Sequence, residues 1–209
     1  LLAGIFWSFG PYVVRHIDEA HTVPWQYLFG RGMVIFLLLN FYLYLEEGLD
    51  FLKNYNKIGV SGVIGSTGLA FAMITFIWSI TNTTAAITLL CLAAMPFITA
   101  LLGFLFLKEK ISINVWISIL VATAGIIIMA FGNHEKNTLI GFVLGIVSAV
   151  GFSVFSVSLR WRKETPKFTT VSLAGLICLL ISSVVIINKD LSFFSSSKNE
   201  ALFAVHGTI

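Results

Sequence analysis

The sequence is poor in charge. Asp, Glu, Lys and Arg make up 11% of its 209 residues, less than half of the roughly 25% found in soluble domains. A folded domain with so few charged residues cannot cover its surface with polar groups, so composition excludes a water-soluble globular protein. Apolar residues make up 57% of the chain, and the 19 phenylalanines among them suit helices that face lipid.

Cysteines and motifs of known chemistry are also scarce. The two cysteines, Cys91 and Cys178, lie inside apolar runs, where a thiol usually behaves as a small hydrophobic side chain. Two distant thiols define neither a disulfide framework nor a zinc site. The sequence contains no phosphate-binding loop, no H-E-x-x-H and no nucleophile elbow. We therefore expect no nucleotide-driven pump, no catalytic residues, no metal site and no cofactor.

Long apolar runs are what the sequence has in abundance. A helix needs roughly 20 apolar residues to cross a bilayer, and a backbone in lipid must satisfy its polar groups internally. The runs predict an all-α, polytopic transmembrane helix bundle in contact with the lipid bilayer, and the abrupt ends suggest a fragment whose first and last helices are truncated. The expected spans are residues 1–14, 24–45, 58–80, 84–107, 112–132, 138–159 and 169–187, with an eighth starting near 201.

Lys and Arg are distributed unevenly over the loops. Of the 13, four lie on one side of the expected bundle, Arg31 lies within a span, and eight lie on the other side. Cytoplasmic loops carry the excess of positive charge, so we expect the richer side and the N-terminus to be cytoplasmic. The basic cluster at 160–167 is expected to contact anionic lipid headgroups and not nucleic acid. The eight are Lys53, Lys57, Lys108, Lys110, Arg160, Arg162, Lys163 and Lys167.

A weak internal repeat suggests two related halves. The glycine spacing of Gly4 and Gly10 in the first span recurs at Gly145 and Gly151 in the sixth. Five spans separate the copies, and an odd number gives them opposite topologies, as in the inverted repeats of many secondary transporters. The expected domains are a first five-helix repeat, residues 1–132, and the start of a second, residues 138–209.

The fourth and fifth spans carry a resemblance to a known family. Residues 89–129 contain a Pro within span four, a Glu at its cytoplasmic end and a Gly in span five, namely Pro96, Glu109 and Gly125. This stretch resembles the EamA-type domain of the drug/metabolite transporter superfamily, as do Phe6-Trp7 and Arg31. The resemblance implies ten spans in inverted five-helix repeats, of which about eight are present here, in a multi-pass protein of the bacterial inner (plasma) membrane.

The resemblance also implies a function. It favours a secondary transporter that moves a small-molecule substrate, amino acids or related compounds, by alternating access, with export as the expected direction. A proton or a counter-substrate is left open as coupling partner, because no Asp or Glu lies mid-span. Two alternatives from other classes stay open: an intramembrane enzyme acting on a lipid or headgroup, and a non-transporting membrane subunit.

Specific functional roles can be expected for three residues. Arg31, roughly 10 Å deep in its span at about 1.5 Å per residue, would anchor an anionic substrate group or serve structurally, by snorkelling to water or binding backbone carbonyls. Pro96 would kink its span and free the carbonyl of Leu92, as a hinge or as a structural bend. Glu109 would act as a gate or form a structural ion pair with a neighbouring helix.

The remaining candidates are polar, aromatic or small. The aromatic candidates could line the substrate path or anchor their span ends at the membrane interface. The Thr candidate could likewise contact substrate or bond the backbone of its own helix. Gly125 is expected to be structural. A G-x-x-x-G pair in span six, Gly141 and Gly145, fits packing inside the bundle or a homodimer, and we favour the bundle. The path candidates are Trp7, Tyr12, Trp78, Asn82 and Thr88.

Overall fold

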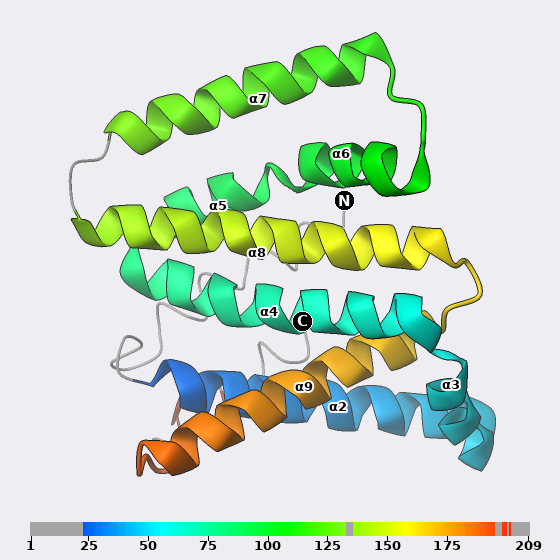
Figure 1. Cartoon of the computed structure of the whole chain (residues 1–209). Coiled ribbons are helices and arrows are strands. Elements are labelled where there is room, and N and C mark those ends of the chain that lie inside the picture. Colours follow the sequence, from blue (N-terminus) through cyan, green and yellow to red (C-terminus); the bar gives the residue numbers. More distant parts are fainter. Residues whose placement is uncertain (1–22, 133–135, 195–197, 200, 202–209) are drawn as a thin grey trace. The chain divides into compact units, whose positions relative to one another are not determined.

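The computed structural model describes residues 23–132, 136–194, 198–199 and 201, and every regular element among them is a helix (Figure 1). The all-α expectation is confirmed, and the expected spans return with bounds shifted by one or two residues. The first span and most of the eighth lie outside the described residues. The elements are α2 (Pro24–Glu47), the 3-10 helix η1 (Gly48–Phe51), α3 (Leu52–Lys57), α4 (Gly59–Asn82), α5 (Ala85–Leu92), α6 (Met95–Leu107), α7 (Ile113–Gly132), α8 (Lys136–Trp161) and α9 (Lys167–Asn188).

Five stretches of the described residues are long and apolar enough to cross a membrane. α7 is a further helix of 20 residues, Ile113–Gly132. Multiple apolar helices of this length identify an integral, multi-pass membrane protein. The five stretches are Pro24–Lys57, Gly59–Asn82, Ala85–Leu107, Leu139–Trp161 and Lys167–Asn188.

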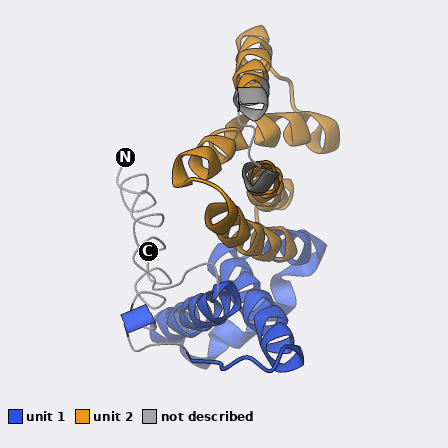
Figure 2. Cartoon of the chain, turned by 90° about the vertical axis from the view of Figure 1, so that its left-hand side faces the viewer, with its two compact units in different colours: residues 1–66, 165–209 blue, residues 67–164 orange. Residues whose placement is uncertain are grey.

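The chain forms two compact units (Figure 2). Unit 1 comprises residues 1–66 and 165–209, and unit 2 comprises residues 67–164, so α4 contributes to both. The units group helices by contact and do not follow the boundary expected near residue 132. The assignment of residues 1–132 and 138–209 to two repeats therefore stays a prediction.

Unit 1 is built on an antiparallel pair, α2 and α9. Tyr42, near the end of α2, packs edge-to-face on Phe168 at the start of α9, with 5.5 Å between ring centroids. The helices cross at two glycines. A Cβ on Gly32 would lie 2.8 Å from the carbonyl oxygen of Gly175, and a Cβ on Gly175 would lie 3.1 Å from that of Gly32. Only glycine allows backbones this close, and such contacts drive helix association in lipid.

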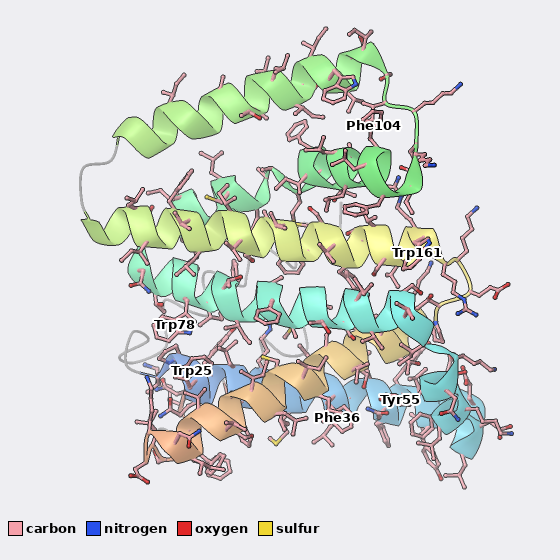
Figure 3. The ribbon with its side chains drawn as sticks, in the orientation of Figure 1. Trp25, Phe36, Tyr55, Trp78, Phe104 and Trp161 are labelled. Atoms are coloured by element: carbon pink, nitrogen blue, oxygen red, sulfur yellow. The ribbon has the colours of Figure 1, made fainter. Side chains whose placement is uncertain are left out.

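Three polar side chains join the helices of unit 1 at the same end as the Tyr42–Phe168 contact. Tyr55 on α3 donates to Oδ1 of Asn40 on α2 (2.8 Å), and Nδ2 of Asn40 donates to the Ser172 hydroxyl on α9 (2.7 Å). The Tyr55 and Ser172 oxygens lie 2.9 Å apart. This ring of hydrogen bonds attaches the short helix α3, which carries Tyr55 in Figure 3, to both long helices.

Unit 2 is built around α8, which packs closely on α4 and α5. A Cβ on Gly151 of α8 would lie 2.6 Å from the carbonyl oxygen of Gly68 on α4. The G-x-x-x-G pair faces the same neighbours: Gly141 lies against Thr83, and Gly145 lies against Cys91. This face of α8 therefore packs inside unit 2, which is the role that we favoured for the glycine pair. A homodimer stays a prediction.

Candidate functional site

Arg31 sits on α2 one residue before the glycine crossing. Its side chain is half-buried, and its Nε is buried without a hydrogen-bond partner among the described residues. Cys178 on α9 is an electrostatic neighbour, and its thiol points to the Leu28 carbonyl at 3.7 Å. Neither of the ion pairs found among the described residues involves Arg31. A charged donor in this position is costly unless it gains a partner.

Sequence reasoning missed Gln26, which lies on the same helix. Its side chain is 5% exposed, and its Oε1 has no hydrogen-bond partner among the described residues. A buried amide oxygen of this kind normally accepts a hydrogen bond. The sequence shows only an amide side chain at the start of an apolar run. Polar residues are common at the ends of membrane spans, so this position did not indicate a buried acceptor. The N-terminal part of α2 thus holds two buried polar atoms without a described partner: a donor, Nε of Arg31, and an acceptor, Oε1 of Gln26.

Thr88 belongs to a buried relay of hydroxyl groups in unit 2. The Ser79 hydroxyl on α4 donates to the Gly141 carbonyl on α8 (2.7 Å), so Ser79 accepts from Thr88 on α5 (2.9 Å). Both hydroxyl side chains are fully buried. This relay connects three helices and occupies the Thr88 hydroxyl, so in this conformation Thr88 contributes to packing.

Trp78 and Asn82 lie near the end of α4, and Figure 3 shows Trp78. Nδ2 of Asn82 donates to the Trp78 carbonyl of its own helix at 2.7 Å. The Asn82 backbone also borders Gly141 on α8. Asn82 therefore stabilises the end of its own helix.

Pro96 lies just after a short interruption of the fourth span, which remains one apolar stretch, Ala85–Leu107, and the expected kink stays a prediction. α5 ends at Leu92, and α6 begins at Met95, so Pro96 is the second residue of a new helix. Pro suits a first helical turn because its missing N–H has no partner to lose there. The Ser153 hydroxyl on α8 donates to the Ala149 carbonyl of its own helix (2.8 Å) and also lies 3.2 Å from the Met95 carbonyl, so α8 approaches the interruption closely.

Glu109 forms an ion pair with Arg160 at the loop end of unit 2. Lys108 ends α6 in a left-handed conformation (φ 55°), and the Glu109 N–H donates to the Gly103 carbonyl (3.2 Å). Gly103 also lies directly beneath the pair, because a Cβ there would be 2.6 Å from Oε2 of Glu109. The sequence did not single out Gly103, and it identified Arg160 only as a member of the basic cluster at 160–167, not as the partner of Glu109.

A groove of about 530 Å³ opens beside this ion pair, within unit 2. It brings together two predicted residues, Pro96 and Glu109. One end of the groove is charged and hydroxyl-bearing, and the other end is apolar. Its lining comes from α6, the 108–112 loop, α7 and α8: Met95, Pro96, Thr99, Ala100, Glu109, Lys110, Ile111, Ser112, Val115, Ser156 and Arg160.

The other candidates do not join these sites. A Cβ on Gly125 of α7 would meet no atom of the described structure within 4 Å, so the described residues do not use Gly125 for close packing. Trp7 and Tyr12 lie outside the described residues. Arg31 belongs to unit 1, whereas Trp78, Asn82, Thr88, Pro96 and Glu109 belong to unit 2.

Comparison with known proteins points to membrane transport. The model of the EamA-like transporter family matches residues 1–131. An uncharacterized transporter of Helicobacter pylori (strain J99) is 26% identical over 151 residues, which are 71% of this chain and 49% of that protein. The uncharacterized transporter YojE of Bacillus subtilis (strain 168) is 25% identical over 134 residues, 61% of this chain and 44% of YojE. The chain spans about half the length of these curated relatives.

Proposed function

The chain belongs to the EamA-like transporter family. We propose that the full protein is a secondary transporter that works by alternating access of two inverted repeats. Its proposed substrate, which it exports, is a small anionic or zwitterionic metabolite such as an amino acid. The two relatives named as transporters support transport over the enzyme and subunit alternatives. The family match, which ends at residue 131, supports a first repeat of residues 1–132. The proposed location is the bacterial inner membrane.

Arg31 is the observation that carries the substrate class. Its Nε is buried without a partner among the described residues, and a guanidinium keeps its charge in proteins. A carboxylate is the ligand that matches its donors, because two parallel N–H···O bonds can form at once. A substrate carboxylate would therefore supply the missing counter-charge.

Counterflow in vesicles tests this function. Full-length protein in liposomes loaded with unlabelled amino acids is expected to accumulate at least one labelled amino acid from outside, while protein-free liposomes do not. Lack of flux of any carboxylate-bearing metabolite by well-folded protein would contradict the proposal. Formation of a modified lipid in detergent would favour the enzyme alternative.

The Glu109–Arg160 pair is proposed as a gate at the loop end of unit 2. The side chains are 38% and 44% exposed, and exposed ion pairs contribute only about 0–1 kcal/mol, so the pair can open and re-form at low cost. Glu109→Gln is expected to change flux by up to about fivefold, and the double swap Glu109→Arg/Arg160→Glu to restore most of it. Equal loss in the single variant and the swap would mean that pairing of these two charges does not control flux.

Orientation can be tested with single cysteines at two exposed positions. Lys163 lies just after α8, on the side expected to be cytoplasmic, and Lys189 caps the end of α9, on the side expected to be external. Each is replaced by cysteine in turn. The native Cys91 and Cys178 are both 0% exposed, so background labelling is low. An impermeant thiol reagent on intact cells is expected to label Lys189→Cys only; the opposite pattern would reverse the topology.

A further inference from the structure

The groove beside the ion pair has two chemically distinct ends. Lys110, Ser112 and Arg160 stand at the charged end, Met95 and Pro96 form the apolar end, and the hydroxyl-bearing Thr99 and Ser156 lie between the two ends. Gly103 lies under the ion pair, and Met95 lies eight residues earlier on α6. At about 1.5 Å per residue, the groove extends about 12 Å along the helix from charge into apolar surroundings.

Aromatic residues place the charged end at the membrane surface. Trp161, the last residue of α8, is 57% exposed, and Figure 3 shows it at the same end of unit 2 as Phe104 of α6. Exposed Trp side chains collect at the level of the lipid headgroups. Phe104 and Phe106 are exposed on α6, the helix that also contributes Met95, Pro96, Thr99 and Ala100 to the groove, and exposed aromatic side chains of this kind suit contact with acyl chains.

The charge around this end favours an anion. The segments 108–112 and 160–164 contain five basic residues and two acidic ones, Glu109 and Glu164. Glu109 is already paired through one nitrogen of Arg160, whose guanidinium carries five N–H donors in all. Lys110 lines the groove and forms no ion pair with a described residue.

We propose that this groove is a binding site for an anionic phospholipid of the surrounding leaflet. The phosphate binds Lys110 and the remaining donors of Arg160, and one acyl chain lies along α6 past Ala100 toward Pro96. A phospholipid is favoured over a soluble anion because the groove combines a basic end at headgroup level with an apolar wall. Basic pockets between helices on the cytoplasmic side are a recognised form of lipid site.

Lipid titration of the full-length protein in detergent tests the proposal. Phosphatidylglycerol is expected to raise the melting temperature in a saturable way, and phosphatidylcholine with the same chains to have little effect. Lys110→Gln is expected to weaken the apparent affinity for phosphatidylglycerol about fivefold. The matched control Lys163→Gln removes the same charge at the same end but outside the groove, and less than about a twofold change is expected. Ala100→Leu, which fills the apolar part, is expected to weaken binding while the lipid-free protein stays folded.

Three outcomes would overturn the site. Equal weakening by Lys110→Gln and Lys163→Gln would indicate diffuse surface attraction. Competition by inorganic phosphate as effective as that by the lipid would indicate an anion site without lipid selectivity. Absence of lipid binding together with strong destabilisation by Ala100→Leu would indicate that another part of the full protein covers the groove. The readout is binding, so this proposal and the transport proposal fail independently.

Discussion

Gly32→Leu is expected to prevent accumulation of folded protein. A Cβ at this position would lie 2.8 Å from the Gly175 carbonyl oxygen and 2.9 Å from the Leu179 backbone nitrogen. Both neighbours are backbone atoms of α9, so they cannot rotate out of the way as a side chain can. Overpacking typically costs 1–3 kcal/mol and occasionally more, and here α2 must separate from its main partner to admit a leucine. Size-exclusion chromatography of a fluorescent fusion in detergent measures the folded fraction.

Gly125→Leu is the matched control, since a Cβ there meets no atom of the described structure. Its effect on unfolding is expected to stay within about 0.5 kcal/mol, as for other open surface positions. Gly175→Ala should lie between the two, because its nearest neighbour is the Ile35 side chain at 3.0 Å, which can adjust. Equal folded fractions for Gly32→Leu and Gly125→Leu would mean that α2 and α9 do not cross at these glycines.

Arg31→Gln is expected to lower flux per folded molecule by about 10- to 100-fold. A hydrogen bond to a charged group contributes about 1.5–3 kcal/mol, which corresponds to this range, and glutamine loses both the charge and the donor fork. Arg31→Lys keeps the charge and loses the fork, so a smaller loss is expected. Counterflow in liposomes, divided by the amount of folded protein in the membrane, gives the comparison.

The control for Arg31 is Lys53→Gln, which removes an exposed charge whose partner is Asp50 at 2.7 Å on the adjoining turn. Near-normal flux is expected there. Two results would remove Arg31 from the substrate path. Near-normal flux in Arg31→Gln would indicate a snorkelling side chain, and loss of folded protein in both Arg31 variants would indicate a structural one.

The bounds of the helices could be predicted closely because the length of each apolar run dominates helix formation in a membrane. A run of apolar residues long enough for the bilayer must become helical, so residues 169–187 were expected where α9 spans Lys167–Asn188. The break before Pro96 was only partly predictable. Proline indicates a disturbance in the span, but it does not reveal which helix lies against it: the Ser153 hydroxyl of α8 lies 3.2 Å from the Met95 carbonyl.

The candidate sites were less predictable, because they depend on residues that are distant in the chain. Glu109 was identifiable as a lone acid at a span end, yet its partner Arg160 lies 51 residues away among several basic residues. The relay from Thr88 through Ser79 needs the positions of three helices. Arg31 was recognisable since a charge within an apolar run is costly wherever the helix packs; Gln26, being neutral, gave a weaker signal.

The divided fourth span has an electrostatic consequence. Each helix carries roughly half a negative charge at its C-terminal end and half a positive charge at its N-terminal end. Between the end of α5 at Leu92 and the start of α6 at Met95, Ala93 and Ala94 keep right-handed helical dihedral angles. The two ends of opposite sign therefore lie only about one turn apart, and their charges largely cancel except close to the interruption. The field that remains is confined to the immediate surroundings of the interruption, where this span carries no ionised side chain. A charged group that crosses the membrane past the break would be attracted to one of these ends and repelled by the other.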